Sequence, residues 1–80
     1  MGNDMKLKEN INPVDFLKQI RTCRSDVYLE TEDEDRLNLK SVLSQYVFIV
    51  LAEQKEMLDK AKVVCEGEED YQTLAEYLLA

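Results

Sequence analysis

The sequence contains no histidine and no tryptophan, and it has only two glycines, one proline and two cysteines. Without histidine, the chain lacks the commonest general base, the usual metal ligand and the usual phosphoryl-accepting imidazole. So few glycines and prolines leave little room for linkers or disorder. The longest apolar run, residues 46–52, is far too short to span a bilayer. Eighty residues of this composition indicate one small folded domain with no membrane-inserted segment.

Basic residues are also scarce relative to acidic ones. The chain has ten lysines and arginines and seventeen aspartates and glutamates, which gives a net charge of −7. Such a charge repels phosphate backbones and anionic lipid headgroups, so we expect neither nucleic acid nor a membrane surface as a partner. Residues 1–10 contain no apolar secretory core, so we predict a cytoplasmic protein.

The first helix has a well-marked start. Asn12 is a favourable N-cap residue, and Pro13 suits the first helical position. An apolar face follows at helical spacing, made by Phe16, Leu17, Ile20 and Cys23. We expect Arg21 and Arg24 in the last turn, where they favour the helix dipole. Residues 1–11 form a separate N-terminal segment, either frayed or pairing as an edge strand over residues 5–9.

Two short strands are predicted at residues 27–31 and 36–40, where apolar and polar side chains alternate. The apolar residues share one face only if paired residue numbers sum to an even value. A sum of 66 pairs Leu29 with Leu37 and leaves a three-residue loop, whereas a sum of 68 leaves five residues. The turn has no glycine, so we expect backbone strain within residues 33–35.

The second helix is predicted to begin after Ser41, a suitable N-cap, and either to continue to residue 60 or to break near residue 52. One apolar strip is expected to pack on the sheet: Leu43, Val47, Val50, Leu51 and Leu58. Another strip lies on a different side: Val42, Tyr46 and Ile49. Phe48 falls between them, so the helix is apolar nearly all round. One helix on one sheet cannot bury all of these side chains, which predicts an exposed apolar face.

A third strand is predicted at residues 61–66, with Ala61, Val63 and Cys65 facing inward. Acidic residues 68–70 then favour the start of a last helix, and we expect them to be solvated. Its buried stripe comprises Leu74, Tyr77 and Leu78. The order predicts an α+β fold of residues 12–80. It is a two-layer open-faced sandwich whose antiparallel sheet has three strands, or four with residues 5–9, covered on one face by three helices.

Three stretches together resemble HPr, the histidine-containing phosphocarrier of the bacterial phosphotransferase system. They are residues 26–30, residues 36–41 and residues 63–70, and the sharpest piece is Leu-Asn-Leu-Lys-Ser directly before a helix. The resemblance implies an antiparallel sheet in spatial order 1-4-2-3. It places residues 61–66 beside residues 27–31, with residues 36–40 at the far edge.

The family's active-site residues are missing. Ahead of the matched Pro13 stand Asn10, Ile11 and Asn12, where the family has a phosphorylatable histidine and an arginine. An amide cannot accept a phosphoryl group as imidazole does, so we predict no phosphocarrier activity. Ser41 matches the position of a regulatory phosphoserine in many HPr proteins, and it is interpreted either as a helix cap or as a phosphorylation site.

The family resemblance also points to a docking surface on the second helix. Val42, Leu43 and Tyr46 match its partner-docking face, and Ile49 joins them by periodicity. We expect these residues to bind another protein or a second copy of the chain. The alternative is that the N-terminal segment or residues 52–60 cover them.

Other chemistry finds little support in the sequence. The acidic turn at residues 30–35 lacks the glycine and ligand spacing of a calcium loop, so we expect no metal. We find no cofactor motif and no nucleophile–base pair, which argues against an enzyme. A binding or regulatory module is the first hypothesis, and a phosphotransferase-system component phosphorylated on Ser41 is the second. The third is a small enzyme subunit using Cys23, although we expect Cys23 and Cys65 to be core thiols rather than reactive or disulfide-bonded.

Overall fold

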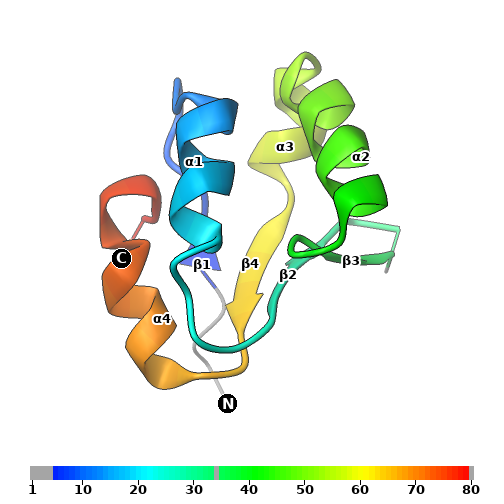
Figure 1. The fold of residues 1–80 in the computed structure, drawn as a ribbon. Coiled ribbons are helices and arrows are strands. Elements are labelled where there is room, and N and C mark those ends of the chain that lie inside the picture. The colour runs from blue at the N-terminus through cyan, green and yellow to red at the C-terminus, as the bar shows by residue number, and fades with distance from the viewer. Residues whose placement is uncertain (1–4, 34, 80) are drawn as a thin grey trace.

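The computed structural model describes residues 5–33 and 35–79, and it has the predicted α+β architecture (Figure 1). A four-stranded antiparallel sheet is covered on one face by helices. Along the chain the elements are β1 (Met5–Lys6), α1 (Pro13–Ile20), β2 (Val27–Glu30), β3 (Arg36–Asn38), α2 (Val42–Ala52), α3 (Lys55–Asp59), β4 (Lys62–Cys65), α4 (Glu68–Thr73) and a 3-10 turn, η1 (Ala75–Tyr77).

The strand order is β1-β4-β2-β3, the spatial order predicted above. Leu29 pairs with Leu37, so the hairpin has the register in which residue numbers sum to 66. The Thr31 N–H donates to the Asp35 carbonyl oxygen at 2.9 Å and closes the three-residue loop. The register places Val27 and Leu29 in the core because only one face of this hairpin is apolar.

The described residues of the β2–β3 turn show no backbone strain of the kind that the turn chemistry predicted. Among the described non-glycine residues, only Asn10 has a positive φ, at 61°. Asp33 and Asp35 therefore avoid the left-handed region, and residue 34, the third position named in that expectation, lies outside the described residues. Asn10 lies between β1 and α1, and asparagine is among the residues that tolerate this conformation best.

Both sides of β1 are paired. Met5 and Lys6 pair with Val63 and Lys62 of β4, so part of the N-terminal segment is an edge strand. The C-terminal segment then covers the outer side of this strand. The Lys8 N–H donates to Tyr77 O and the Leu79 N–H donates to Lys6 O, each at 2.8 Å. The edge of β4 is therefore not left bare for intermolecular pairing.

The core fills the space between the sheet and the helices. Its buried apolar side chains are Leu7, Phe16, Leu17, Ile20, Cys23, Val27, Leu29, Leu39, Phe48, Leu58, Ala61, Val63, Cys65, Leu74 and Leu78. At its centre the Phe16 ring lies 5.5 Å from the Phe48 ring and 5.3 Å from the Tyr77 ring, centroid to centroid. The inward positions predicted for β4 are confirmed.

The first helix is shorter than predicted, and the second has the shorter of its two predicted lengths. α1 ends at Ile20, so Arg21 occupies the C-cap position and Arg24 lies beyond the helix. The second helix breaks after Ala52, and the short α3 follows. The last helix likewise ends at Thr73, and a 3-10 turn carries the chain back to β1.

Candidate functional site

The side of α2 that is buried is not the side that the sequence predicted. Phe48 is fully buried, whereas Leu43 is 75% exposed and Val50 is 58% exposed. The predicted buried strip was therefore wrong for Leu43, Val47 and Val50, whereas Leu58 is buried and Leu51 packs against the core. The helix is apolar on nearly every side, so periodicity could not identify the buried side. The buried side is the one that carries Phe48, whose ring contacts Phe16.

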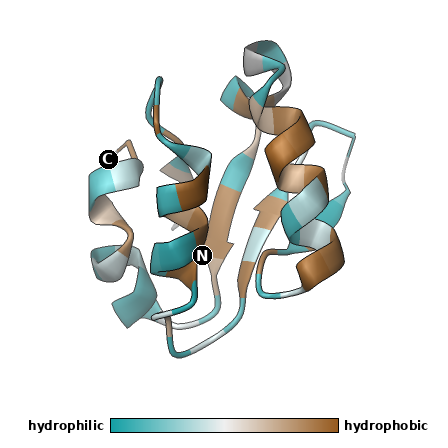
Figure 2. Cartoon of the chain, turned by 45° about the horizontal axis from the view of Figure 1, so that its top comes forward, coloured by the Kyte–Doolittle hydropathy of each residue, from teal (hydrophilic) through white to brown (hydrophobic). Residues whose placement is uncertain are grey.

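The exposed apolar side chains of α2 form one surface, called the α2 face here. Its members are Val42, Leu43, Tyr46, Val47 and Val50. Most of the helix is coloured as hydrophobic, with one teal-to-white band between two brown stretches, whereas α1 alternates hydrophobic and hydrophilic residues (Figure 2). Three of the predicted docking residues, Val42, Leu43 and Tyr46, are thus open to solvent, and no described part of the N-terminal segment or of residues 52–60 covers them. The fourth, Ile49, is half-buried against the core.

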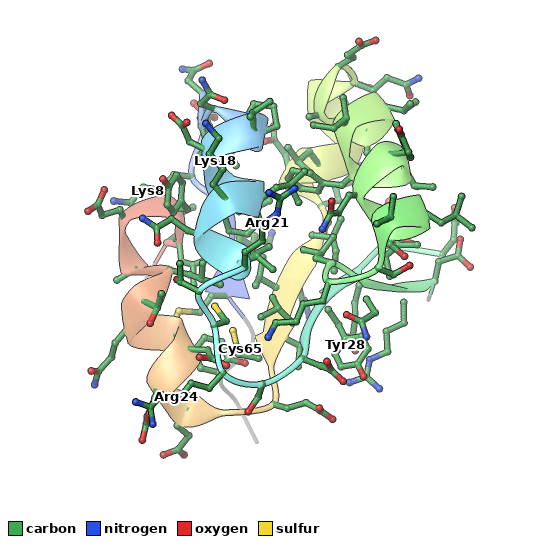
Figure 3. The ribbon with its side chains drawn as sticks, viewed as in Figure 1. Lys8, Lys18, Arg21, Arg24, Tyr28 and Cys65 are labelled. Atoms are coloured by element: carbon green, nitrogen blue, oxygen red, sulfur yellow. The ribbon has the colours of Figure 1, made fainter. Side chains whose placement is uncertain are left out.

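A groove of about 380 Å³ runs between α1 and α2, beside the α2 face. Apolar side chains from both helices line it: Val14, Leu17, Val42, Tyr46 and Ile49. Lys18 and Arg21 of the α1 segment also line the groove, and neither forms an ion pair with a described residue (Figure 3). This edge is therefore positively charged in a protein whose net charge is −7.

Ser41 takes the N-cap position of α2, yet its side chain makes no capping hydrogen bond. Its hydroxyl is exposed, so the cap interpretation holds for the backbone position and not for the side chain. The neighbouring polar groups are occupied. The Lys40 ammonium donates to Cys23 O at 2.6 Å, and the Gln45 amide donates to Leu39 O at 3.1 Å.

An amide side chain caps the start of α1, close to where the HPr resemblance predicts a histidine and an arginine. Asn12 Oδ1 accepts hydrogen bonds from the Val14 and Asp15 N–H groups at 3.0 and 3.2 Å. This N-cap was predicted, and it uses the first-turn donors that attract anions at a helix N-terminus. Ile11, in front of it, is half-buried against the core.

Both cysteines are buried free thiols. Burial raises the pKa of Cys23 to about 11, with the Asp70 carboxylate adding to the shift and Lys40 opposing it. Burial, the Cys23 thiol and Asp70 raise the pKa of Cys65 to about 12. Both thiols are therefore protonated at neutral pH, which is typical of buried core cysteines and not of nucleophilic ones.

Asp70 has a structural role that the sequence prediction missed. The expectation of a solvated charge was wrong, because the residue is 2% exposed. Its two carboxylate oxygens accept the N–H groups of Arg24 and Ser25, each at 2.9 Å. A Cβ at Gly67 would lie 2.9 Å from the Ser25 hydroxyl, so a larger residue there would displace that hydroxyl. We call this contact the Asp70 clamp.

Within the described residues, no three acidic, cysteine or histidine side chains form a group that could hold a metal ion. No helix of the described chain combines the length and apolar character needed to cross a membrane. Comparisons with protein-family models, with curated proteins and with solved structures find no match for this chain.

Proposed function

We propose that this chain is an HPr-like protein-binding or regulatory module of the cytoplasm that has lost phosphocarrier activity and is not an enzyme. The observation that carries the proposal is the α2 face. Five large apolar side chains stand exposed on one helix, of which Phe48 is the one fully buried side chain. Monomeric proteins rarely expose contiguous apolar patches of this kind, and such patches are typical of interaction sites.

Two further observations support the proposal. The sheet has the strand order that the resemblance implies, and α2 follows β3 as the resemblance requires. The position of the phosphoryl-accepting histidine is held by amides, one of which caps α1. Because the phosphoryl-accepting histidine is missing, we infer that the protein binds a partner and transfers no phosphoryl group.

Photo-crosslinking tests the binding function. We would place benzoylphenylalanine at position 46 on the α2 face and, as a control, at the exposed position 72 on α4. Irradiation in cells should give a discrete adduct from position 46 that Leu43→Glu abolishes, and none from position 72. Equal labelling from both positions, or no adduct from position 46, would overturn the proposal.

The loss of phosphocarrier activity has a separate test. Incubation with Enzyme I and the phosphoryl donor of the phosphotransferase system should leave the protein unlabelled. The positive control is an HPr protein that carries the phosphorylatable histidine, which the same mixture should label. An acid-labile phosphoryl adduct on the unmodified chain would contradict the expectation.

Regulation through Ser41 is the second candidate function. The hydroxyl is exposed and uncapped at the start of an eleven-residue helix, next to a pocket lined by Arg21 and Lys40. A phosphate there would meet backbone N–H groups and two cations. A serine kinase with ATP should label the chain and not Ser41→Ala, while the matched Ser44→Ala variant is labelled normally. Labelling that persists in Ser41→Ala would exclude this role.

A further inference from the structure

We propose that the α2 face binds a second copy of this chain, with the two α2 helices antiparallel about a twofold axis. The inference rests on the proposed binding function of that face and identifies its partner. It follows from how charge is distributed along α2 rather than from exposure alone.

The α2 face is apolar in the middle and oppositely charged at its two ends. Between Val42 and Ala52 the helix contains no charged residue. Beyond its N-terminus Arg21 and Lys40 line one pocket with Val42, and beyond its C-terminus lie the exposed Glu53 and Glu56. The helix dipole has the same polarity, positive at the N-terminus and negative at the C-terminus. The surface therefore has a positive and a negative end, separated by an α2 length of about 16 Å.

An antiparallel second copy complements this surface at both ends. The positive end of each copy meets the negative end of the other, and the two helix dipoles oppose. A parallel copy would instead set like charges against like. At 100° per residue, Glu53 lies on the side of α2 that carries Val42 and Tyr46, which is the side toward α1 and Arg21. A twofold axis perpendicular to α2 within the interface keeps these sides together, so Glu53 of one copy faces Arg21 of the other.

The apolar centre suits the same contact. Leu43, Val47 and Val50 recur at i, i+4 and i+7, the spacing that lets one helix pack along another. These three side chains are uncharged, so burying them in an interface does not desolvate an ion. An acidic helix from another protein would satisfy only the Arg21 end and would repel Glu53. The face is thus self-complementary, as an isologous dimer contact requires.

Sedimentation equilibrium tests the dimer directly. The wild-type chain should associate reversibly to a dimer, Tyr46→Glu should raise the dissociation constant more than about a hundredfold, and the matched Gln72→Glu should leave it unchanged. A wild-type chain that stays monomeric throughout the concentration range overturns the dimer. Crosslinking from position 46 to a different protein would then still support the binding function, so the two failures are distinguishable.

Charge reversal tests the antiparallel arrangement. Arg21→Glu alone and Glu53→Arg alone should each weaken the dimer about tenfold, because each sets like charges together at both ends of the contact. The double variant should regain wild-type association, and so should an equimolar mixture of the single variants. In a parallel dimer neither single variant would weaken association. Single variants that bind like wild type, or a double variant that stays weak, would overturn the proposed geometry.

Discussion

The two helices that flank the groove, α1 and α2, lie on the same face of the sheet and meet at the core through one ring contact, Phe16 with Phe48 (Figures 1 and 2). Their exposed sides differ sharply. The eight-residue α1 buries three apolar side chains and exposes charged Asp15 and Lys18. The eleven-residue α2 is more apolar, yet Phe48 is its one fully buried side chain.

The comparison separates hydrophobicity that builds the fold from hydrophobicity that serves another purpose. In α1, apolar side chains lie where the core needs them, and a capping amide fixes the start of the helix. In α2, five apolar side chains are exposed to solvent, and the N-cap side chain forms no capping hydrogen bond. The excess on α2 therefore points to binding rather than to stability.

The largest effect should come from the ring that anchors α2. Phe48→Ala removes a fully buried side chain and should lower the free energy of unfolding by about 3–5 kcal/mol. Leu43→Ala on the same helix should cost less than about 0.5 kcal/mol, because its side chain is 75% exposed. Urea unfolding at a concentration where the chain is monomeric measures both. If the two variants lost similar amounts of unfolding free energy, the side of α2 that carries Leu43 would be buried as well. The difference between α1 and α2 would then not hold.

The next effect concerns how the end of α1 is held. Asp70→Ala leaves the N–H groups of Arg24 and Ser25 without their acceptor and should cost about 2–3 kcal/mol. The adjacent Glu69→Ala is the matched control, because Glu69 makes only a solvent-exposed contact with Arg24 at 3.9 Å. Thermal unfolding of both variants measures the difference. If Glu69→Ala were as costly as Asp70→Ala, surface charge rather than the Asp70 clamp would tie α4 to the end of α1.

The buried thiols next to this clamp predict a loss of stability at alkaline pH. The pKa of Cys23 rises from 9.0 to about 11 on folding, so its thiol stays protonated in the native state while the unfolded chain ionises. The stabilisation is complete below about pH 9 and is lost as pH rises toward 11 and, for Cys65, toward 12. Each thiol contributes a slope of at most about 1.4 kcal/mol per pH unit.

Comparison of slopes isolates the thiols from the other groups that titrate in this range. Unfolding of Cys23→Ala and of Cys65→Ala should depend less steeply on pH between 9 and 11 than unfolding of the wild type. Leu43→Ala on the exposed α2 face is the control and should keep the wild-type slope. Cysteine variants with an unchanged slope would place the thiols in contact with water.

The parts of the fold that could be predicted are those where only one arrangement satisfies the residues. Val27 and Leu29 share a face with Leu37 in one parity only, which limited the hairpin to two predicted sums, and the structure has the sum of 66. Asn12 before a proline predicted the start of α1 for a similar reason. On α2 every side offers apolar residues, so the sequence identified the excess and not the buried side.

The Asp70 clamp lay beyond prediction for a different reason. Its carboxylate accepts hydrogen bonds from residues 45 and 46 positions earlier in the chain. These partners approach only because β2 pairs with β4, where Val27 lies opposite Cys65. In the sequence, Asp70 is one of three consecutive acidic residues at a helix start, and nothing local distinguishes it from Glu68 or Glu69.

The smallest effect compares the N-caps of the two helices directly. Asn12→Ala removes the acceptor of the Val14 and Asp15 N–H groups and should cost about 1 kcal/mol. Ser41→Ala should change the free energy of unfolding by less than about 0.3 kcal/mol, because the hydroxyl bonds to no N–H group of α2. Chemical denaturation of the two variants at the same low concentration measures the difference. Equal losses would show that the Ser41 hydroxyl caps α2 in solution, and α2 would then resemble α1 at its start. If Ser41→Ala leaves the free energy of unfolding unchanged, the hydroxyl is not needed for folding. It could then be phosphorylated without the loss of a capping hydrogen bond.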